Sequence, residues 1–182
     1  MTLRLVAPSL AGLAGYAAAL EAGWSPNTER DVSAEQLMLA RHDPGGLIYQ
    51  LTRQDGTIVT GSGDRVPRLP SRVFWLDDGA FCGSTNFRYA RGSDALPVHV
   101  NGHVGYAVVP WKRRRGYATE ALRLILPVAR EAGLGRVQIT CDDDNEPSRR
   151  VILKNGGEFI GTRLESGGRT KLVFGIDVAT GG

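Results

Sequence analysis

The sequence predicts an α+β fold around one mixed β-sheet, and three observations carry this prediction. Strand-like segments come early, and from residue 103 onward the order becomes strand, helix, strand, helix and strand. Turn signals at Asp55-Gly56 and Asp78-Gly79 lie between apolar segments, as they do in β-hairpins. A chain of 182 residues with 42% hydrophobic and 23% charged residues is typical of one globular domain with a substantial core.

The first half of the chain is expected to place two helices before its main hairpin. Ser9 is suited to cap the first helix, because its hydroxyl can accept from a backbone N–H of the first turn. Residues 43–71 are the least readable part, and the turn signal there favours a hairpin about Asp55-Gly56. The other expected elements are a strand over 3–6, helices over 10–23 and 33–42, and hairpin strands over 72–76 and 80–90.

The second half is expected to alternate strands and helices. Pro127 lies inside the first of these helices and should kink or shorten it, because its ring clashes with the preceding turn. Asn145 should cap the next helix, whose first turn tolerates Pro147. The expected elements are strands over 103–109, 136–142, 157–161 and 170–178, and helices over 118–131 and from 146 onward.

The segment "WKRRRGYATEAL" (111–122) carries four consecutive cations between a strand and a helix. The first N–H groups of a helix lack intrahelical partners, and together with the helix dipole they bind anions such as pyrophosphate. Cations oppose that dipole, so Arg113 to Arg115 are better explained by an anionic partner than by a solvated helix end. A nucleic-acid patch would be expected to have interleaved aromatic residues, which this segment lacks. The pattern therefore predicts a phosphate-binding site that includes Gly116.

Two motifs resemble those of the GNAT acetyltransferase superfamily. Arg113, Gly116 and Ala118 are similar to the R/Q-x-x-G-x-G/A motif, and "CDDDNEPSRRVILKNGGEF" is similar to the second motif of the superfamily. The likeness is specific over residues 72–160 and is greatest to an uncharacterised bacterial group of predicted acetyltransferases. It implies a GNAT-like acyltransferase fold, in which a mostly antiparallel mixed sheet is flanked by helices and splayed at the cofactor strand. It also implies a single domain over 1–182, with an acceptor side in 1–71 and a cofactor-binding core in 72–178.

The resemblance further implies an N-acetyltransferase that uses acetyl-CoA as cosubstrate and acetylates an amine by direct attack in a ternary complex. Pantetheine would lie along Tyr106, Ala107 and Val108, with the Val108 N–H polarising the thioester carbonyl. Asn145 would reach the pantetheine arm, and Ser148 would lie near its sulfur. The residues expected at the pyrophosphate are Arg113, Arg114, Arg115, Gly116, Tyr117, Ala118 and Thr119.

The proton-transfer groups are left open by the sequence. Where many family members have a tyrosine as general acid, this chain has Ile152, so Tyr106, Tyr89 or water would protonate the thiolate. His103 is the histidine best placed to act as general base. A local structural role competes with catalysis for His103, because it is separated from Val108 by an odd number of residues and would point to the opposite face.

Rival functions and partners also follow from the sequence. A non-catalytic CoA-binding regulator is one alternative, and a nucleic-acid-binding module is a weaker one, since the net charge is only +3. The amine acceptor stays open between small molecules and peptides, and so does a homodimer. No metal site is expected, because Asp142 to Asp144 lack the glycine and glutamate of a calcium loop. Cys82 and Cys141 lie in apolar runs without disulfide spacing, which favours a cytoplasmic protein. No membrane segment is expected, because no uninterrupted apolar span approaches the roughly 18 residues of a membrane helix.

Overall fold

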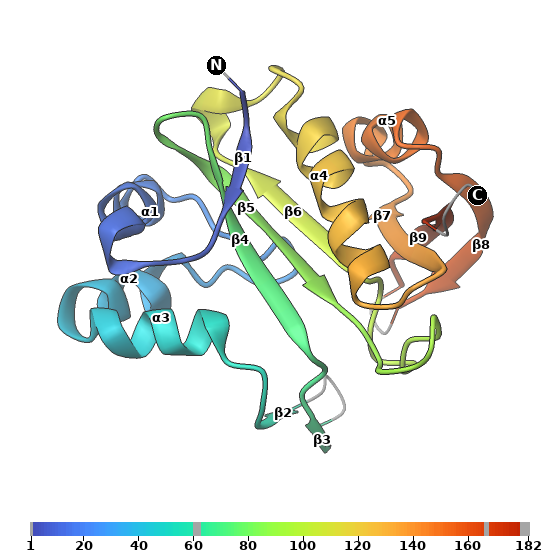
Figure 1. Ribbon diagram of the computed structural model, residues 1–182, viewed down its shortest axis with the longest axis horizontal. Helices are drawn as coiled ribbons and strands as arrows, with labels where there is room; N and C mark the ends of the chain where they lie inside the picture. Colours follow the sequence, from blue (N-terminus) through green and yellow to red (C-terminus); the bar gives the residue numbers. More distant parts are fainter. Residues whose placement is uncertain (1, 60–62, 166–167, 179–182) are drawn as a thin grey trace. The chain divides into compact units, whose positions relative to one another are not determined.

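The structure, a computed structural model, describes residues 2–59, 63–165 and 168–178 (Figure 1). The chain forms two compact units that interleave along the sequence. The first unit contains the residues up to Gln54, Ser71–Asn86 and Tyr106–Ala121. The second contains Asp55–Pro70, Phe87–Gly105 and the residues from Leu122 onward.

The first unit combines helices with most of a four-stranded sheet of order β1-β4-β5-β6. β1 pairs antiparallel with β4, with Val6 opposite Trp75. The elements are β1 (Arg4–Val6), η1 (Leu10–Gly12), α1 (Leu13–Glu21), α2 (Ser33–His42), α3 (Pro44–Thr52), β4 (Ser71–Asp77), β5 (Phe81–Arg88), β6 (Val104–Val108), η2 (Pro110–Lys112) and the start of α4 (Tyr117–Glu131).

Side-chain alternation along these strands builds two apolar clusters in the first unit. Successive strand residues point to opposite faces, so Trp75 and Leu76 enter different clusters. Trp75 joins the cluster that residues of α1 and α3 complete, and its ring stacks on Tyr16 at a centroid distance of 4.9 Å. Leu76 packs with Leu3, Cys82 and Ala121.

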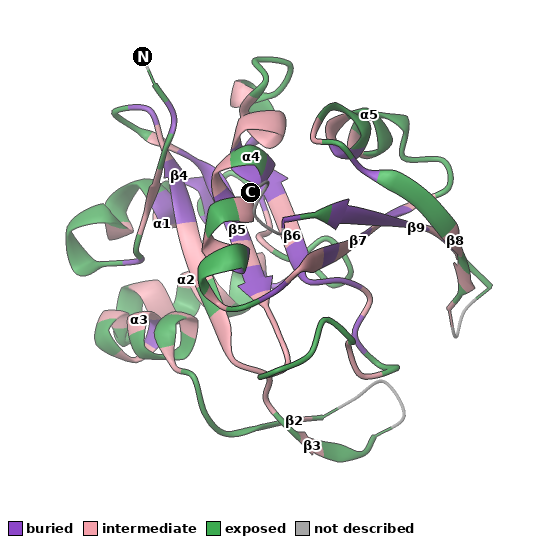
Figure 2. Cartoon of the chain, turned by 45° about the vertical axis from the view of Figure 1, so that its right-hand side comes forward, coloured by how far each residue is buried: buried purple, intermediate pink, exposed green. Residues whose placement is uncertain are grey.

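The second unit contains a three-stranded antiparallel sheet of order β7-β9-β8. β9 (Thr170–Asp177) is largely buried, whereas β8 (Glu158–Leu164) is mostly exposed (Figure 2). The remaining elements are the antiparallel pair β2 (Thr57–Val59) and β3 (Arg65–Pro67), the rest of α4, β7 (Arg136–Asp142) and α5 (Glu146–Lys154). No helix of the described residues is long and apolar enough to cross a membrane.

Three details differ from the sequence-based expectations. The predicted hairpin about Asp55-Gly56 is wrong in its first arm, because Pro44–Thr52 form α3 and Thr57–Val59 pair with Arg65–Pro67. Pro127 does not shorten α4, which continues to Glu131. Within the described residues, the strands are grouped into sheets of four, two and three strands, with β6 at the end of one sheet and β7 at the end of another.

Candidate functional site

β6 turns one edge of its backbone toward β5 and the other edge away from it. The Val109 N–H, just past the strand, donates to the Cys82 carbonyl at 3.0 Å. Backbone N–H groups of successive strand residues point to opposite edges, and the N–H and C=O of one residue share an edge. The N–H and C=O of Val108 therefore point away from β5, at the strand that ends the sheet.

Gly83 on β5 lets β6 approach closely. A Cβ atom there would lie 2.2 Å from the Ala107 carbonyl oxygen and 2.9 Å from the Val108 Cα. Its φ of +143° is also a conformation that L side chains rarely adopt. This position accepts only glycine without displacing the strand that carries Val108.

The loop between β6 and α4 is held in an unusual backbone conformation. The Nε of Arg113 donates to the Val108 carbonyl at 3.2 Å. Arg114 has φ 64° and Gly116 has φ 79°, both in the left-handed region. This backbone conformation costs a non-glycine residue about 1–2 kcal/mol. The surrounding structure must therefore hold Arg114 in it.

This loop leads directly into the N-terminus of α4. The N–H of Glu120 donates to the Gly116 carbonyl at 3.0 Å, which closes the first helical turn. The amides of Tyr117 and Ala118 precede that first bond, and a Cβ at Gly116 would meet no atom within 4 Å. The amides and the open space beside Gly116 fit an anionic group at the positive end of the helix dipole.

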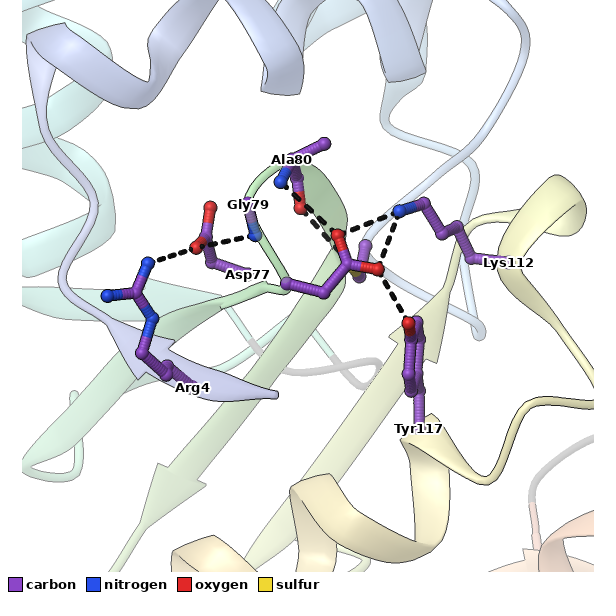
Figure 3. A network of polar contacts seen from close by, with 8 residues as sticks. Arg4, Asp77, Gly79, Ala80, Lys112 and Tyr117 are labelled. Atoms are coloured by element: carbon purple, nitrogen blue, oxygen red, sulfur yellow. Dashed lines mark hydrogen bonds and ion pairs between the residues drawn. The ribbon is translucent and has the colours of Figure 1, made fainter. Parts of the chain in front are cut away.

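A buried carboxylate ties the loop to the β4–β5 turn (Figure 3). Asp78 is 8% exposed, and its two oxygens accept from Lys112 Nζ at 2.8 and 2.7 Å. The Tyr117 hydroxyl donates to Asp78 Oδ2 at 2.5 Å. The hydrogen bond from Lys112 is the main reason that the pKa of Asp78 is far below its usual range, and the same contacts raise the pKa values of Lys112 and Tyr117.

The four cations of the run therefore have different surroundings. Lys112 is paired with Asp78, and Arg113 holds the Val108 carbonyl. Arg114 and Arg115 are exposed, and neither makes an ion pair with any described residue. Within the run, the described carboxylate Asp78 neutralises Lys112, and Arg114 and Arg115 are left exposed at the start of α4, which suits an anion such as pyrophosphate.

The remaining predicted cofactor residues lie in two places. Tyr106, Ala107 and Thr119 lie in the first unit, on β6 and in the first turn of α4. Asn145 and Ser148 lie in the second unit, where the Asn145 side chain caps α5 by accepting from the Ser148 N–H at 3.1 Å. The cap predicted for Asn145 is confirmed, and the cofactor contacts of both residues stay predictions.

The environment of His103 favours the structural role over the catalytic one. The side chain is 0% exposed, and its Nδ1 accepts from the Gln138 N–H at 2.9 Å. Burial lowers the pKa of this imidazole below its usual value. Ile152, at the position where many family members have a tyrosine, is fully buried on α5.

Sequence reasoning missed Asp78, Lys112 and Gly83 as parts of this site. The sequence indicates Asp78 only as a hairpin turn residue and Lys112 only as a member of the cation run. A pair of adjacent acids, as in "LDDGA", is common in turns, and Asp78 differs from Asp77 through its long-range contacts with Lys112 and Tyr117. Gly83, within an apolar strand, was a weak signal for close backbone approach.

Comparisons with known proteins identify the family of the chain. The sequence profile of the Acetyltransferase (GNAT) domain matches residues 67–158, just over half of the chain, so the chain belongs to the GNAT acetyltransferase family. Membership confirms the predicted GNAT fold, the acetyltransferase function and acetyl-CoA as the cosubstrate. It supports the acyltransferase prediction and not the CoA-binding regulator.

Solved structures share the fold at low sequence identity. The RimL ribosomal L7/L12 α-N-protein acetyltransferase in complex with coenzyme A has a TM-score of 0.66 and 16% identity, covering 99% of this chain and 97% of that chain. The microcin C7 self-immunity acetyltransferase MccE, in complex with acetyl-CoA and AMP, has a TM-score of 0.63 and 12% identity, covering 96% and 92%. Mycobacterium smegmatis RimJ with CoA-disulfide has a TM-score of 0.58 and 20% identity, covering 96% and 85%. No curated protein matches the chain significantly.

Proposed function

We propose that β6, the following loop and the first turn of α4 hold acetyl-CoA, and that the enzyme transfers acetyl directly to the α-amine of a peptide. Bound acetyl-CoA supplies an activated thioester. The observation that carries the proposal is the Val108 N–H, which points away from β5 at the end of the sheet and beside the Arg113–Gly116 loop. A preorganised backbone donor of this kind stabilises the charge that develops on a carbonyl oxygen.

Different residues would bind different parts of acetyl-CoA. The amides at the start of α4 and the guanidinium groups of Arg114 and Arg115 would bind the pyrophosphate, and Arg113 would hold the loop against Val108. Tyr106 and Ala107 would line the pantetheine. Asn145 and Ser148 would contribute from α5, as the family motif implies.

The peptide α-amine is the acceptor to test first. RimL is described as a ribosomal L7/L12 α-N-protein acetyltransferase, and a Salmonella typhimurium structure of TM-score 0.65 and 14% identity as modifying the N-terminal serine of L7/L12. A panel should compare a serine-initiated peptide with a free α-amine, the same peptide with a blocked α-amine and a free lysine, a polyamine and an aminoglycoside. Acetylation of the blocked peptide alone would move the proposal to lysine side chains.

A cytoplasmic location and the absence of a nucleic-acid partner belong to the same proposal. They are supported by two buried free cysteines and by the pairing of Lys112 with Asp78, which reduces the charge of the cation run.

The proposed pyrophosphate-binding site is tested by substituting Gly116. Gly116→Ala places a methyl group beside the proposed anion, and we expect CoA affinity, measured by calorimetry, to fall about tenfold or more. Gly133→Ala is the matched control, because Gly133 follows the other end of α4 with φ +91° and also has no atom within 4 Å of a built Cβ. Both substitutions carry similar backbone strain. Equal CoA affinity in the two variants would contradict the proposal that pyrophosphate binds beside Gly116.

A further inference from the structure

Asp78 contacts both ends of the loop that precedes α4. Lys112 ends η2 on one side of residues 113–116, and Tyr117 begins α4 on the other side. Both donate to the same carboxylate, Lys112 through its ammonium group and Tyr117 through its hydroxyl (Figure 3). The Ala80 N–H donates to Asp78 Oδ1 at 3.2 Å and anchors the carboxylate to its own turn.

The segment between the two contacts contains one unfavourable backbone conformation. Glycine adopts the positive φ of Gly116 without strain, but the φ of 64° at Arg114 is unfavourable for a residue with a side chain. Such a conformation persists only where surrounding contacts fix it. The side chains of Asp78 and Lys112 are only 7% and 17% exposed, so solvent screens their ion pair less than it screens a pair on the open surface.

The neighbouring Asp77 provides an internal comparison. It lies in the same turn, but its side chain faces β1, where it accepts from Arg4 at 2.7 Å and from the Gly79 N–H at 3.1 Å (Figure 3). It is 25% exposed, and both of these partners, Arg4 and Gly79, lie outside residues 112–117. Two adjacent carboxylates of one turn therefore differ in whether they touch the loop.

We propose that Asp78 is a positioning residue for the cofactor loop, which it holds in its phosphate-binding conformation through Lys112 and Tyr117. The inference rests on the proposed function, because it assigns the loop to the pyrophosphate of acetyl-CoA. Asp78 also neutralises Lys112, so that Arg114 and Arg115 are left to face the anion. Asp78 touches no reacting atom and acts through the loop.

The first measurement is CoA affinity by calorimetry in Asp78→Asn, Tyr117→Phe and Asp77→Asn. Asp78→Asn removes the charge that pairs with Lys112, and hydrogen bonds to charged groups are strong enough that we expect about a tenfold or greater loss of CoA affinity. Tyr117→Phe deletes one hydrogen bond and should cause a smaller loss in the same direction. Asp77→Asn should retain wild-type affinity.

The second measurement reports on the loop without any ligand. Trp111 is 50% exposed and adjoins Lys112, whereas the other two tryptophans, Trp24 and Trp75, are 3% and 2% exposed. Acrylamide quenching of tryptophan fluorescence therefore reports mainly on Trp111. Release of the loop in Asp78→Asn should change the quenching constant of this accessible fraction, while Trp24 and Trp75 stay protected. General loosening of the fold would instead make all three tryptophans accessible.

The outcomes separate this inference from the proposed function. Wild-type CoA affinity and quenching in both Asp78→Asn and Tyr117→Phe would overturn the positioning role, and so would equal effects of Asp78→Asn and Asp77→Asn. If Asp78→Asn fails to fold, Tyr117→Phe alone decides by the same two measurements. If the wild-type protein binds no CoA, the proposed function fails, and the quenching experiment still decides whether Asp78 holds the loop.

Discussion

His103 shows how one residue can fit a catalytic pattern and still have a structural environment. Its Nδ1 accepts from the Gln138 N–H, so in the neutral imidazole the proton lies on Nε2. Nε2 is buried and has no hydrogen-bond partner among the residues that the structure describes. Protonation would place a second donor at Nδ1 against the Gln138 N–H and would bury a charge. Both effects keep His103 neutral in the folded protein.

This environment predicts a pH-dependent stability. The pKa of His103 is lowered in the folded state, so below about pH 6.5, the usual histidine pKa, the unfolded chain binds the proton first. The free energy of unfolding should therefore decrease as pH falls from about 6.5 until the folded-state pKa is reached. In His103→Gln this part of the decrease should be absent, as measured by urea denaturation between pH 7.5 and 5.

The same variant tests the catalytic alternative. A structural His103 predicts that His103→Gln keeps the pH profile of kcat/KM, apart from any loss of folded protein. A variant that loses an activity limb below pH 6.5, about 10²-fold or more in rate, while its pH–stability curve matches the wild type would restore His103 as general base.

Among the secondary-structure elements, the position of β6 depends on Gly83 of the neighbouring strand β5. Gly83→Ala would place a methyl group within 2.2 Å of the Ala107 carbonyl oxygen, at a φ that alanine rarely adopts. We expect destabilisation by about 2 kcal/mol or more and a lower CoA affinity, because Val108 moves with its strand. Calorimetry and urea denaturation measure both effects.

Gly45→Ala is the control for this substitution. Gly45 lies exposed in α3 with no atom within 4 Å of a built Cβ and without a positive φ. Alanine there should stabilise the protein by about 0.5–1 kcal/mol, because glycine is a poor helix former. A stable Gly83→Ala protein with unchanged CoA affinity would contradict the close approach of β5 and β6.

The start of α5 separates capping from cofactor binding. Asn145→Asp preserves an acceptor for the Ser148 N–H, so stability should hold within about 0.5 kcal/mol, whereas Asn145→Ala should lose about 1 kcal/mol. If the side-chain amide also donates to pantetheine, both variants should raise the KM for acetyl-CoA. An unchanged KM in Asn145→Asp would leave Asn145 as a cap alone.

Elements with local signals were predictable from the sequence, and those that depend on packing were not. The strand over 136–142 and the helix over 33–42 have the predicted bounds, because periodicity and end signals lie within the segments themselves.

α3 was missed because "DPGGLIYQLT" combines turn residues with β-formers. Its helix is set by the Asp43 cap and by Leu47, which is 1% exposed in the apolar cluster. Gly116 belongs to a local motif, whereas Lys112 and Tyr117, which connect Asp78 to the loop, lie more than 30 residues from it in the sequence.

For the molecule as a whole, the chemistry of its thiols bears on the reaction route. The chain has two cysteines, and both are buried and free. Burial raises the pKa of Cys82 to about 11 and raises that of Cys141 as well. At neutral pH both are therefore protonated thiols, and a thiol without thiolate character is a poor nucleophile. A covalent acetyl-cysteine intermediate is disfavoured, and direct attack by the amine is the route that remains consistent with the proposal.

Direct attack predicts intersecting double-reciprocal initial-rate lines when acetyl-CoA and the acceptor are both varied, because both substrates must be bound together. Mass spectrometry of the enzyme mixed with acetyl-CoA alone should show no acetylated cysteine. Iodoacetamide at pH 7.5 should leave the activity of the native enzyme within about twofold of the untreated sample, since buried neutral thiols react slowly. The same reagent in denaturant should modify Cys82 and Cys141 and serves as the positive control. Parallel initial-rate lines together with an acetyl group on Cys82 or Cys141 would show that the enzyme works through an acetyl-enzyme, and the direct route would then be wrong.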